Sequence, residues 1–517
     1  MVTKILIANR GEIAVRIIRT CREMGLETVA VFSEPDRVSP HVLMASEAYP
    51  IGPAPSADSY LRADKILEVA KKSGADCVHP GYGFLSENVS FATAVQEAGL
   101  TWIGPPPESM AQMGDKIAAR SLARDLNVPV IPGSDQPLVS PEQAEVAAQS
   151  VGFPVLVKAV GGGGGKGMRI VNNPRELSDA LTRASSEATS SFSDERVFLE
   201  KYLPHPRHIE IQVVADAHGS VAAFPERECS IQRRYQKIIE ESPSPFVTPG
   251  SRKKLVSWAK KITSECGYRG VGTVEFLADE KGNFFFLEMN TRLQVEHPVT
   301  EMISGVDLVR EQIRVSSGEK LSLVAEGTPA GKDALVKTSG QAIECRIYAE
   351  DGFRNFIPST GTVLGLEIPD GFGTRFDHGL RVGQEITPHY DPLLGKLITW
   401  GITRKGALNR MKRALKECHI VGVETTVPFC YAVLSHPRFD AGDIHTHFIP
   451  EEMDRLKETS SRDRESHRQI ASVLAAIHAW DTSPVSSHDG SRKESLGEKS
   501  EESVSRWKSS GRKDALR

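Results

Sequence analysis

The sequence has few of the features that mark secreted, membrane-embedded or metal-stapled proteins. Its 517 residues contain only seven cysteines, which are scattered and form no CxxC pair. This pattern argues against a disulfide framework and a zinc site and favours a reducing cytosol. No uncharged apolar run approaches the roughly 18 residues of a membrane span, and MVTKILIANRGE enters a folded pattern without a signal peptide. We therefore expect a cytoplasmic protein without a membrane partner.

An excess of charge of one sign is also missing. The 63 Lys and Arg residues and 67 Asp and Glu residues give a formal net charge of −4, and no single-sign block dominates. Electrostatics therefore gives no reason to expect a nucleic-acid partner, and any anion site must be local. With 39% apolar and 25% charged residues, a chain of this length buries a large core and divides into several domains.

The first 114 residues alternate between short apolar runs and helical patterns. TKILIANRG is typical of a strand, EIAVRIIRTCREMG of an amphipathic helix and ETVAVFS of a second strand, and the alternation continues to LTWIGP. This repetition predicts an open, mostly parallel sheet covered by helices. Ligands bind at the carboxyl ends of such strands, where the loop HPGYGFLSEN, 79–88, is expected. Its Tyr82 either contacts a ligand or packs within a Gly/Pro turn.

The run VLVKAVGGGGGKGMRIV carries the strongest phosphate signal. It contains GxGxxG, but that fingerprint must open a helix, whereas MRIV continues as a strand pattern. A Walker A loop fails as well, because Val160 and Gly167 stand where it requires Gly and Ser or Thr. The remaining interpretation is a flexible flap between two strands, with Lys158 and Lys166 beside backbone amides that can approach phosphate. The alternative is a plain Gly-rich linker.

The segment EMNTRLQVEHP, 288–298, places a polar group at every second position through Glu296. Side chains of an extended chain alternate between two faces. We therefore expect one face to carry Glu288, Asn290, Arg292, Gln294 and Glu296, and the other to carry Leu287, Met289, Leu293 and Val295.

A hairpin is predicted just before this segment. GTVEFLADEKGNFFFLE has a turn signal at Lys281-Gly282, and a symmetric loop there sets Glu275 directly opposite Glu288. Opposed carboxylates repel unless a cation lies between them. With Asn290 they offer hard oxygen donors suited to Mg²⁺ or Mn²⁺ beside substrate phosphates. The alternative is a pair of solvated carboxylates on an open sheet face.

The residues beyond the two carboxylates suit acid–base chemistry on an anion. Arg292 can neutralise a small anion, and Glu296 can take a proton from it. The segment ECSIQRRYQKIIEE adds further cationic and amide groups, which either join the site or form a solvated basic face: Gln232, Arg233, Arg234 and Lys237.

The last part of the chain differs in composition. A charged run, 451–465, precedes RQIASVLAAIHAW, whose apolar stripe predicts one amphipathic helix at about 466–480. That helix either packs on the body of the protein or docks a partner. The Ser-rich stretch after it has too few apolar residues to offset its ordering entropy.

Together the motifs resemble those of the biotin carboxylases, which are members of the ATP-grasp superfamily. The resemblance covers about residues 1–450 and rests on ANRGEIAVRIIR, HPGYGFLSEN, GGGGGKGMRIV, EKYLPHPRHIEIQV, QRRYQK, EMNTRLQVEHPVTE and ECRIYAED. It implies an α/β fold (α+β overall) with a Rossmann-like N-terminal domain, 1–114. An ATP-grasp domain, 115–330, with a mobile glycine-rich lid at about 131–203, would follow. A mixed C-terminal domain, 331–450, and the tail, 451–517, would complete the chain.

The resemblance also implies a reaction and a role for individual residues. ATP and bicarbonate would form carboxyphosphate beside two Mg²⁺ or Mn²⁺ ions, and the carboxyl group would pass to biotin. The residues expected around ATP are Lys116, Lys158, Gly163, Gly164, Gly165, Gly167, Glu200, Lys201, Leu203, His208, Gln232 and Tyr235. The family often has His where this chain has Tyr235, and Tyr cannot become cationic near neutral pH.

The remaining roles concern the metal, bicarbonate and biotin. Glu275, Glu288 and Asn290 would bind the metal ions. Lys237, Arg292, Gln294 and Val295 would receive bicarbonate. Glu296 would deprotonate it, Arg346 would stabilise the biotin enolate, and Tyr82 would lie near the biotin ring.

The resemblance extends to partners. Carrier domains of the family present a lysine in an AMKM-type hairpin, and this sequence contains no such segment. We therefore expect a separate biotin carboxyl carrier protein and a separate carboxyltransferase subunit, as in acetyl-CoA, propionyl-CoA or pyruvate carboxylases. The family is frequently dimeric, so a homodimer is a further expectation. Two alternatives stay open: another ATP-grasp carboxylate–amine ligase, and a catalytically silent nucleotide-binding regulatory subunit.

Overall fold

The computed structural model describes residues 2–459 except 135, 139, 161–167, 193 and 324–333, and further along only 472–473 and 475–476. The chain divides into two compact units, Met1–Ser461 and Arg462–Arg517. The glycines of the predicted flap, Gly163, Gly164, Gly165 and Gly167, lie outside the described residues, as does nearly all of the predicted helix at about 466–480. No helix among the described residues is long and apolar enough to cross a membrane.

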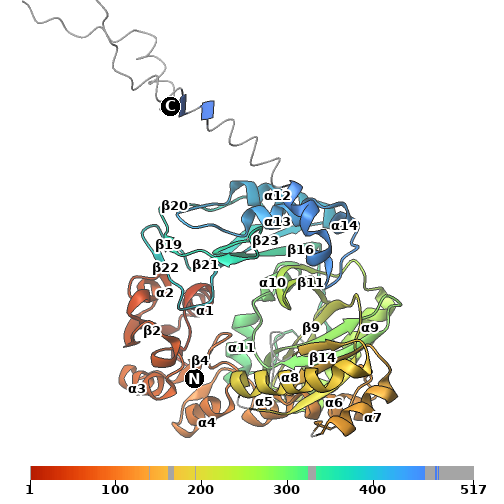
Figure 1. Cartoon of the computed structure of the whole chain (residues 1–517). Helices are drawn as coiled ribbons and strands as arrows, with labels where there is room; N and C mark the ends of the chain where they lie inside the picture. Colours follow the sequence, from red (N-terminus) through yellow and green to blue (C-terminus); the bar gives the residue numbers. More distant parts are fainter. Residues whose placement is uncertain are drawn as a thin grey trace, which may run out of the picture. The chain divides into compact units, whose positions relative to one another are not determined.

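The N-terminal region contains a five-stranded parallel sheet of order β3-β2-β1-β4-β5, drawn in red and orange in Figure 1. Its strands are β1 (Lys4–Ile7), β2 (Glu27–Ser33), β3 (Glu47–Gly52), β4 (Cys77–His79) and β5 (Thr101–Trp102). Its helices are α1 (Gly11–Glu23), α2 (Pro40–Met44), α3 (Ala63–Ser73), α4 (Val89–Glu97) and α5 (Pro107–Gly114). The predicted open parallel sheet is confirmed.

Helix α1 packs on this sheet through the apolar stripe that its sequence shows. Ile13, Ile17, Ile18 and Cys21 are almost fully buried against Ile5 and Ile7 of β1. Gly11 has φ +66°, a left-handed conformation that glycine adopts without steric cost, and it starts the helix. The turn places the buried Glu12 in the first turn of α1.

A ten-stranded sheet forms the centre of the first unit. Its main order is β14-β13-β9-β11-β12-β16-β23-β21, with β10 between β9 and β15, and its neighbouring strands are antiparallel apart from β10 and β15. The strands are β9 (Arg207–Ala215), β10 (Val221–Ala223), β11 (Arg227–Arg233), β12 (Gln236–Ser242), β13 (Gly270–Ala278), β14 (Phe284–Asn290), β15 (Ala334–Leu335), β16 (Gln341–Tyr348), β21 (Thr374–His378) and β23 (Leu393–Gly401). Helices α6 (Lys116–Asp125), α9 (Pro249–Glu265), α10 (His297–Ser304) and α11 (Leu308–Ser316) accompany it.

A smaller sheet of order β7-β6-β8 has its own core. It contains β6 (Val155–Ala159), β7 (Met168–Val171) and β8 (Val197–Lys201), with α7 (Pro141–Val151) and α8 (Leu177–Phe192) packed on it. Strands β6 and β7 are antiparallel neighbours, so the glycine-rich residues 161–167 connect two paired strands. MRIV is therefore a strand, as predicted.

The C-terminal region adds helices and short ribbons to β16, β21 and β23. Helices α12 (Arg404–Glu417), α13 (Val427–Ser435) and α14 (Pro437–Asp440) contribute to one apolar core. The ribbons pair β17 (Glu350–Asp351) with β18 (Ile357–Pro358), β19 (Gly361–Thr362) with β22 (Glu385–Ile386), and β20 (Gly365–Glu367) with β24 (His419–Val421). Residues 448–459 are helical, and Leu456 is fully buried in this core. The folded body thus continues past residue 450, where the tail was predicted to begin.

Candidate active site

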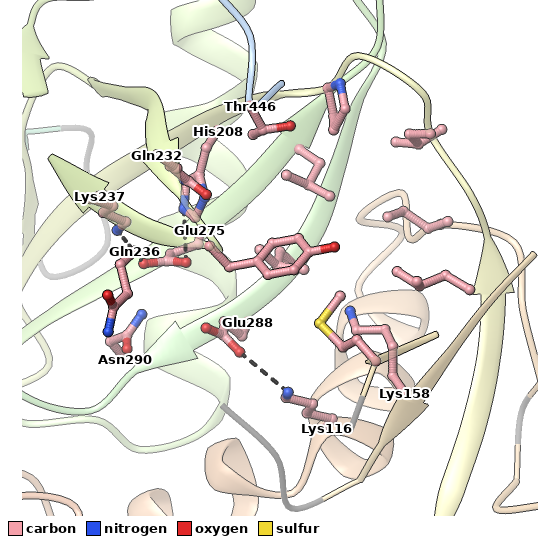
Figure 2. Close-up of a pocket in the computed structure, with 18 of the residues that line it drawn as sticks. Lys116, Lys158, His208, Gln232, Gln236, Lys237, Glu275, Glu288, Asn290 and Thr446 are labelled. Carbon is pink, nitrogen blue, oxygen red and sulfur yellow. Dashed lines mark hydrogen bonds and ion pairs between the residues drawn. The ribbon is translucent and has the colours of Figure 1, made fainter. Parts of the chain in front are cut away.

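A cavity of about 350 Å³ opens between the small sheet and the ten-stranded sheet. Among the described residues, every site residue implied by the family resemblance lines it, except Val295 and Tyr82; Arg233 and Arg234, which could have joined the site, do not line it. These lining residues are Lys116, Lys158, Glu200, Lys201, Leu203, His208, Gln232, Tyr235, Lys237, Glu275, Glu288, Asn290, Arg292, Gln294, Glu296 and Arg346. Figure 2 shows several of them pointing toward one another from separate elements.

The hairpin brings the two predicted metal carboxylates together. Strands β13 and β14 pair Glu275 directly with Glu288, as predicted, and both line the cavity. The route to this register differs from the expected one, because the pairs nearest the turn, such as Phe276 with Phe286, follow a different alignment. An irregularity at Leu287 shifts the register by one residue. Leu287 therefore lines the cavity, which corrects its prediction for the opposite face.

The strand that carries Glu288 ends earlier than the alternation predicted. β14 stops at Asn290, and Glu296 is the N-cap residue of α10, with φ −80° and ψ +10°. The period-two argument fails beyond residue 290 because the backbone leaves the extended conformation there. Arg292, Gln294 and Glu296 reach the cavity from this irregular segment instead.

Lysines and an acid line one end of the cavity. Lys116 begins α6, and its Nζ lies 4.0 Å from Glu288 Oε2 (Figure 2). Lys158 on β6 donates to Glu200 at 2.9 Å, and Arg120 also pairs with Glu200. Burial lowers the pKa of Lys116, against the attraction of Glu288. Burial alone would raise the pKa of Glu200, but Lys158 and Arg120 hold it below its ordinary value.

At the opposite end, one lysine joins three buried acids. Lys237 Nζ donates to Glu210 at 2.5 Å, to Glu275 at 2.8 Å and to Glu296 at 2.6 Å. Glu296 also accepts from Arg346 Nη2 at 2.8 Å. Burial alone would raise the pKa of Glu296, but the charges of Lys237 and Arg346 keep it far below its ordinary value. Glu296 is therefore an ionised carboxylate, which is the form that accepts a proton.

The donor set around Glu275 fits a divalent cation. Glu275 lies 2.8 Å from His208 Nε2, and Gln294 donates to it at 2.6 Å. Asn290 accepts from Arg292 through its amide oxygen at 3.2 Å, while its Nδ2 is buried without a hydrogen-bond partner among the described residues. Two carboxylates and an amide oxygen are hard ligands of the kind that Mg²⁺ and Mn²⁺ prefer. In this structure the two carboxylates also contact lysines: Lys237 donates to Glu275, and Lys116 lies 4.0 Å from Glu288.

Several lining residues were not predicted. Apolar contacts come from Ile131, Leu156, Met168, Leu277 and Leu287, and polar ones from Tyr202, Gln236, Tyr348, Asp391, Thr446 and His447. Thr446 and His447 arrive from the C-terminal region: Thr446 N donates to Pro206 O at 3.0 Å, and His447 Nε2 lies 3.2 Å from Tyr202 Oη. No local motif in the sequence announces such a long-range approach.

The acid Glu210 was missed although the sequence carried a signal for it. HIEIQV alternates polar and apolar residues, so His208, Glu210 and Gln212 share one face of β9. Arg227, fully buried, pairs with Glu210 and donates to Gln212 at 2.7 Å and to Gln294 at 2.8 Å. Through Arg227, this buried network holds Gln294, which lines the cavity.

Val295 and Tyr82, the two predicted residues that do not line the cavity, contact a buried ion pair formed by Lys396 and Glu12. The Val295 carbonyl accepts from Lys396 Nζ at 3.1 Å, and the Tyr82 hydroxyl donates to Glu12. Lys396 also lies 3.2 Å from Glu12.

Family models match three successive stretches of the chain. They are the biotin carboxylase N-terminal domain at residues 1–110, the carbamoyl-phosphate synthase L chain ATP binding domain at 115–324, and the biotin carboxylase C-terminal domain at 344–451.

Close relatives and a solved structure agree with these matches. The chain is 51% identical over 452 residues to a pyruvate carboxylase subunit of Methanothermobacter thermautotrophicus, covering 87% of this chain and 90% of that protein. It is 50% identical over 449 residues to biotin carboxylase of Halalkalibacterium halodurans, covering 87% and 97%. The biotin carboxylase domain dimer of Hydrogenobacter thermophilus 2-oxoglutarate carboxylase, in complex with MgADP, ADP and bicarbonate, superposes with a TM-score of 0.84. That domain is 45% identical, and the match covers 88% of this chain and 99% of that one.

Proposed function

The chain belongs to the biotin carboxylase family of ATP-dependent ligases, and we propose that the cavity described above is its active site, where both half-reactions of biotin carboxylation take place. A biotin carboxylase subunit uses ATP and bicarbonate to carboxylate biotin. One observation carries the assignment to this cavity: acids, cations and a proton acceptor from five separate segments converge in it, among them Lys116, Lys237, Glu288, Glu296 and Arg346.

ATP would lie between the small sheet and the ten-stranded sheet. Lys116 and Lys158 would bind its phosphates, and the glycine-rich residues 161–167 would cover them. The remaining ATP contacts in this proposal are Glu200, Lys201, Leu203, His208, Gln232 and Tyr235, all of which line the cavity. The Hydrogenobacter relative was crystallised with MgADP and ADP, which supports a nucleotide here.

Glu275, Glu288 and Asn290 would hold two Mg²⁺ or Mn²⁺ ions. Bound there, the metal would supply positive charge that stabilises the γ-phosphate during transfer. The chain's own part is to orient these oxygen ligands, and Gln294 does so by donating to Glu275 at 2.6 Å.

Bicarbonate would bind among Lys237, Arg292, Gln294 and Val295, with Glu296 as the base. Glu296 would take the bicarbonate proton on a carboxylate oxygen, and the freed bicarbonate oxygen would attack the γ-phosphorus of ATP, which breaks the bond to the β–γ bridging oxygen, releases ADP and gives carboxyphosphate. The ion pairs with Lys237 and Arg346 depress the basicity of Glu296. An anionic substrate bound beside Lys237 would take up part of that lysine's positive charge and so raise the basicity of Glu296.

Arg346 would stabilise the enolate of biotin, with Tyr82 beside the biotin ring. Both roles follow from the family resemblance, and the position of Arg346, 2.8 Å from Glu296, supports a shared site for the two half-reactions. The guanidinium cannot lose its proton in this pH range, so it stabilises the anion without acting as an acid.

The carboxylase would act with a biotin carboxyl carrier protein and a carboxyltransferase subunit, which the similarity to a pyruvate carboxylase subunit supports. A homodimer is supported by the dimer in the Hydrogenobacter relative. A cytoplasmic location is supported by seven buried cysteines without a disulfide. The proposed domains run over 1–114, 115–330 and 331 to about 459, followed by the tail.

Bicarbonate-dependent ATP hydrolysis, measured with and without free biotin, tests the assignment. We expect hydrolysis to require bicarbonate and to rise with biotin. Hydrolysis without biotin stimulation would point to a different ATP-grasp ligase, and no turnover at all would point to a regulatory subunit. Copurification with a biotinylated protein would identify the carrier, and its other subunit would identify the carboxyl acceptor.

A further inference from the structure

Lys396 on β23 is a charged residue with no exposed surface. Its Nζ donates to the carbonyl oxygen of Val295 at 3.1 Å and lies 3.2 Å from Glu12 Oε1. It also lies 5.8 Å from the ring centre of Tyr82, whose hydroxyl donates to the same Glu12. A buried cation is costly unless it is paired and hydrogen-bonded. The described contacts of Lys396 meet this need, and they connect β23 to Glu12, Tyr82 and Val295, which lie far away in the sequence.

The sheet places Lys396 beside Arg346, the residue proposed to stabilise the biotin enolate. Lys396 is the direct cross-strand partner of Arg346 on β16, and on its other side it pairs with Asp377 on β21. Directly opposed residues project from the same face of a sheet. Lys396 and Arg346 therefore rise side by side from one face, and of the two only Arg346 lines the cavity.

The contact with Val295 bears on the proposed base. The Val295 carbonyl belongs to the planar peptide group that leads into Glu296. A clamp on that oxygen fixes the plane and hence the direction in which the Glu296 side chain leaves the backbone. The segment 291–296 is irregular, so β-ladder hydrogen bonds do not hold this peptide.

The backbone brings Glu12 to this point by close contact. A Cβ at Gly379, just after β21, would lie 2.8 Å from the backbone nitrogen of Glu12. Only glycine permits this approach without displacement. The first turn of α1 is thus seated against the end of β21, with the Glu12 carboxylate directed to Lys396.

We propose that Lys396 is a positioning residue for biotin carboxylation: with Glu12 as its counter-ion, it clamps the Val295–Glu296 peptide and the Tyr82 ring at a fixed separation. The base and the side of the cavity proposed to face biotin then stay aligned through both half-reactions. The inference deepens the proposed function and rests on the proposed role of Glu296.

Glu12 gives the clamp a measurable pH dependence. Burial raises the pKa of Glu12 to about 7, against the opposing effect of Lys396. Asp377 raises this pKa further, whereas Arg375 lowers it, and Tyr82 donates to the carboxylate. Above about pH 7, Glu12 is charged and its pair with Lys396 is complete. Below that pH the proton neutralises Glu12, and Lys396 keeps only the negative charge of its cross-strand neighbour Asp377, so the clamp weakens as pH falls.

The first experiment replaces Lys396 by Met, which keeps the length of the side chain and removes its charge. We expect kcat/KM for bicarbonate and for free biotin to fall by about 10- to 100-fold, the range for a small misalignment of reacting groups. KM for ATP should stay within about twofold, because the ATP contacts lie elsewhere. The control is Lys405→Met, which removes an exposed lysine paired with Asp440 on the surface and should change none of these values.

The second experiment does not depend on the folding of that variant. Glu12→Gln keeps the size of the side chain and an acceptor for Tyr82. In wild type, kcat/KM for bicarbonate at constant bicarbonate concentration should rise through pH 7, and in Glu12→Gln this rise should disappear. In the double variant Glu12→Gln/Lys396→Met the loss should be smaller than the product of the two single losses, because the two residues act as one pair.

Two outcomes would overturn the inference. One is a folded Lys396→Met enzyme with wild-type kcat/KM for bicarbonate and biotin, or with an equal loss for ATP, which a general structural role predicts. The other is an unchanged pH profile in Glu12→Gln. A wild-type enzyme without biotin-stimulated ATP hydrolysis would instead refute the proposed function, so the two failures are distinguishable.

Discussion

The cavity has a base end, around Lys237 and Glu296, and a phosphate end, around Lys116 and Lys158. The carboxylates at these two ends are paired with cations in different ways. At the base end, the side chains of Glu210, Glu275 and Glu296 are at most 4% exposed and all contact Lys237 at 2.5–2.8 Å. At the phosphate end, Glu200 is also buried and closely paired, with Lys158 and Arg120, but Glu288 is 34% exposed and stands 4.0 Å from Lys116, the limit of an ion pair. The protein thus neutralises the acids around Lys237 and the acid Glu200 with its own cations, and it leaves one carboxylate, Glu288, loosely paired at the phosphate end.

This difference has a physical meaning for the two half-sites. Tight, buried ion pairs keep catalytic groups in place before the substrate arrives, which is the basis of electrostatic preorganisation. A partly exposed carboxylate beside a lysine, such as Glu288, can instead rearrange when a nucleotide and its cation bind. We infer that the base end is built in advance and that the phosphate end is completed by its ligand.

The largest effect is expected at the phosphate end. Glu288→Gln keeps the shape of the side chain but removes the charge that would hold the metal, so metal-dependent turnover should fall more than about 10³-fold. The melting temperature should stay unchanged, since Glu288 has no tightly buried partner. ATP hydrolysis across a Mg²⁺ titration, together with a thermal melt, measures both. Substantial turnover at saturating Mg²⁺ would remove Glu288 from the metal site.

A slightly smaller effect is expected at the base end. Glu296→Ala should reduce carboxylation by about 10²- to 10³-fold, the usual contribution of a general base. ATP affinity should be preserved, because Glu296 contacts Lys237 and Arg346 rather than the lysines of the phosphate end. Nucleotide binding by calorimetry and carboxylation of free biotin separate the two quantities. Near-normal carboxylation in this variant would mean that another group takes the proton.

Sequence patterns predicted the features that depend on neighbouring residues. The parallel N-terminal sheet follows from local alternation, and the β13–β14 pairing follows from turn position and strand period. Even there, the Glu275–Glu288 pair was predicted through two differences that cancel. The centre of the turn lies half a residue from the position that a symmetric loop assumed, and the extra residue at Leu287 shifts the register back by the same amount. Local rules place strands well but not the bulges that adjust them.

The parts that escaped prediction depend on distant contacts. Lys396 stands in LLGKLITWG, where one lysine in an apolar strand carries no sign of its partners Glu12 and Val295. Thr446 reaches the cavity through a contact with the loop at Pro206. Arg227 belongs to this group too, because its partners lie on four other segments. Spacing within a segment cannot reveal such meetings, since tertiary packing alone creates them.

Arg227 offers a test that affects stability more than binding. It is fully buried and contacts Glu210, Gln212, Thr273, Gln294 and Thr300. Arg227→Met leaves Glu210 with less compensation in a buried place, which typically costs roughly 3–5 kcal/mol. Urea denaturation should show this loss, while Lys116→Met at the loosely paired end should show far less. Equal stability of the two variants would contradict the contrast between the two ends.

The smallest effect is expected at Tyr235, where the family often has His. Tyr235 lines the cavity from a two-residue turn between β11 and β12 in which it and Arg234 have positive φ, a conformation that His tolerates well. Burial raises the pKa of Tyr235, so it stays uncharged across the physiological range. Tyr235→His should therefore change KM for ATP by less than about threefold at pH 8, where imidazole is neutral. At pH 6 the imidazolium would attract the anionic nucleotide, so KM for ATP should fall relative to wild type. A KM ratio between variant and wild type that is the same at both pH values would mean that position 235 does not face the nucleotide's charge, and the phosphate end would then depend on Lys116 and Lys158 alone.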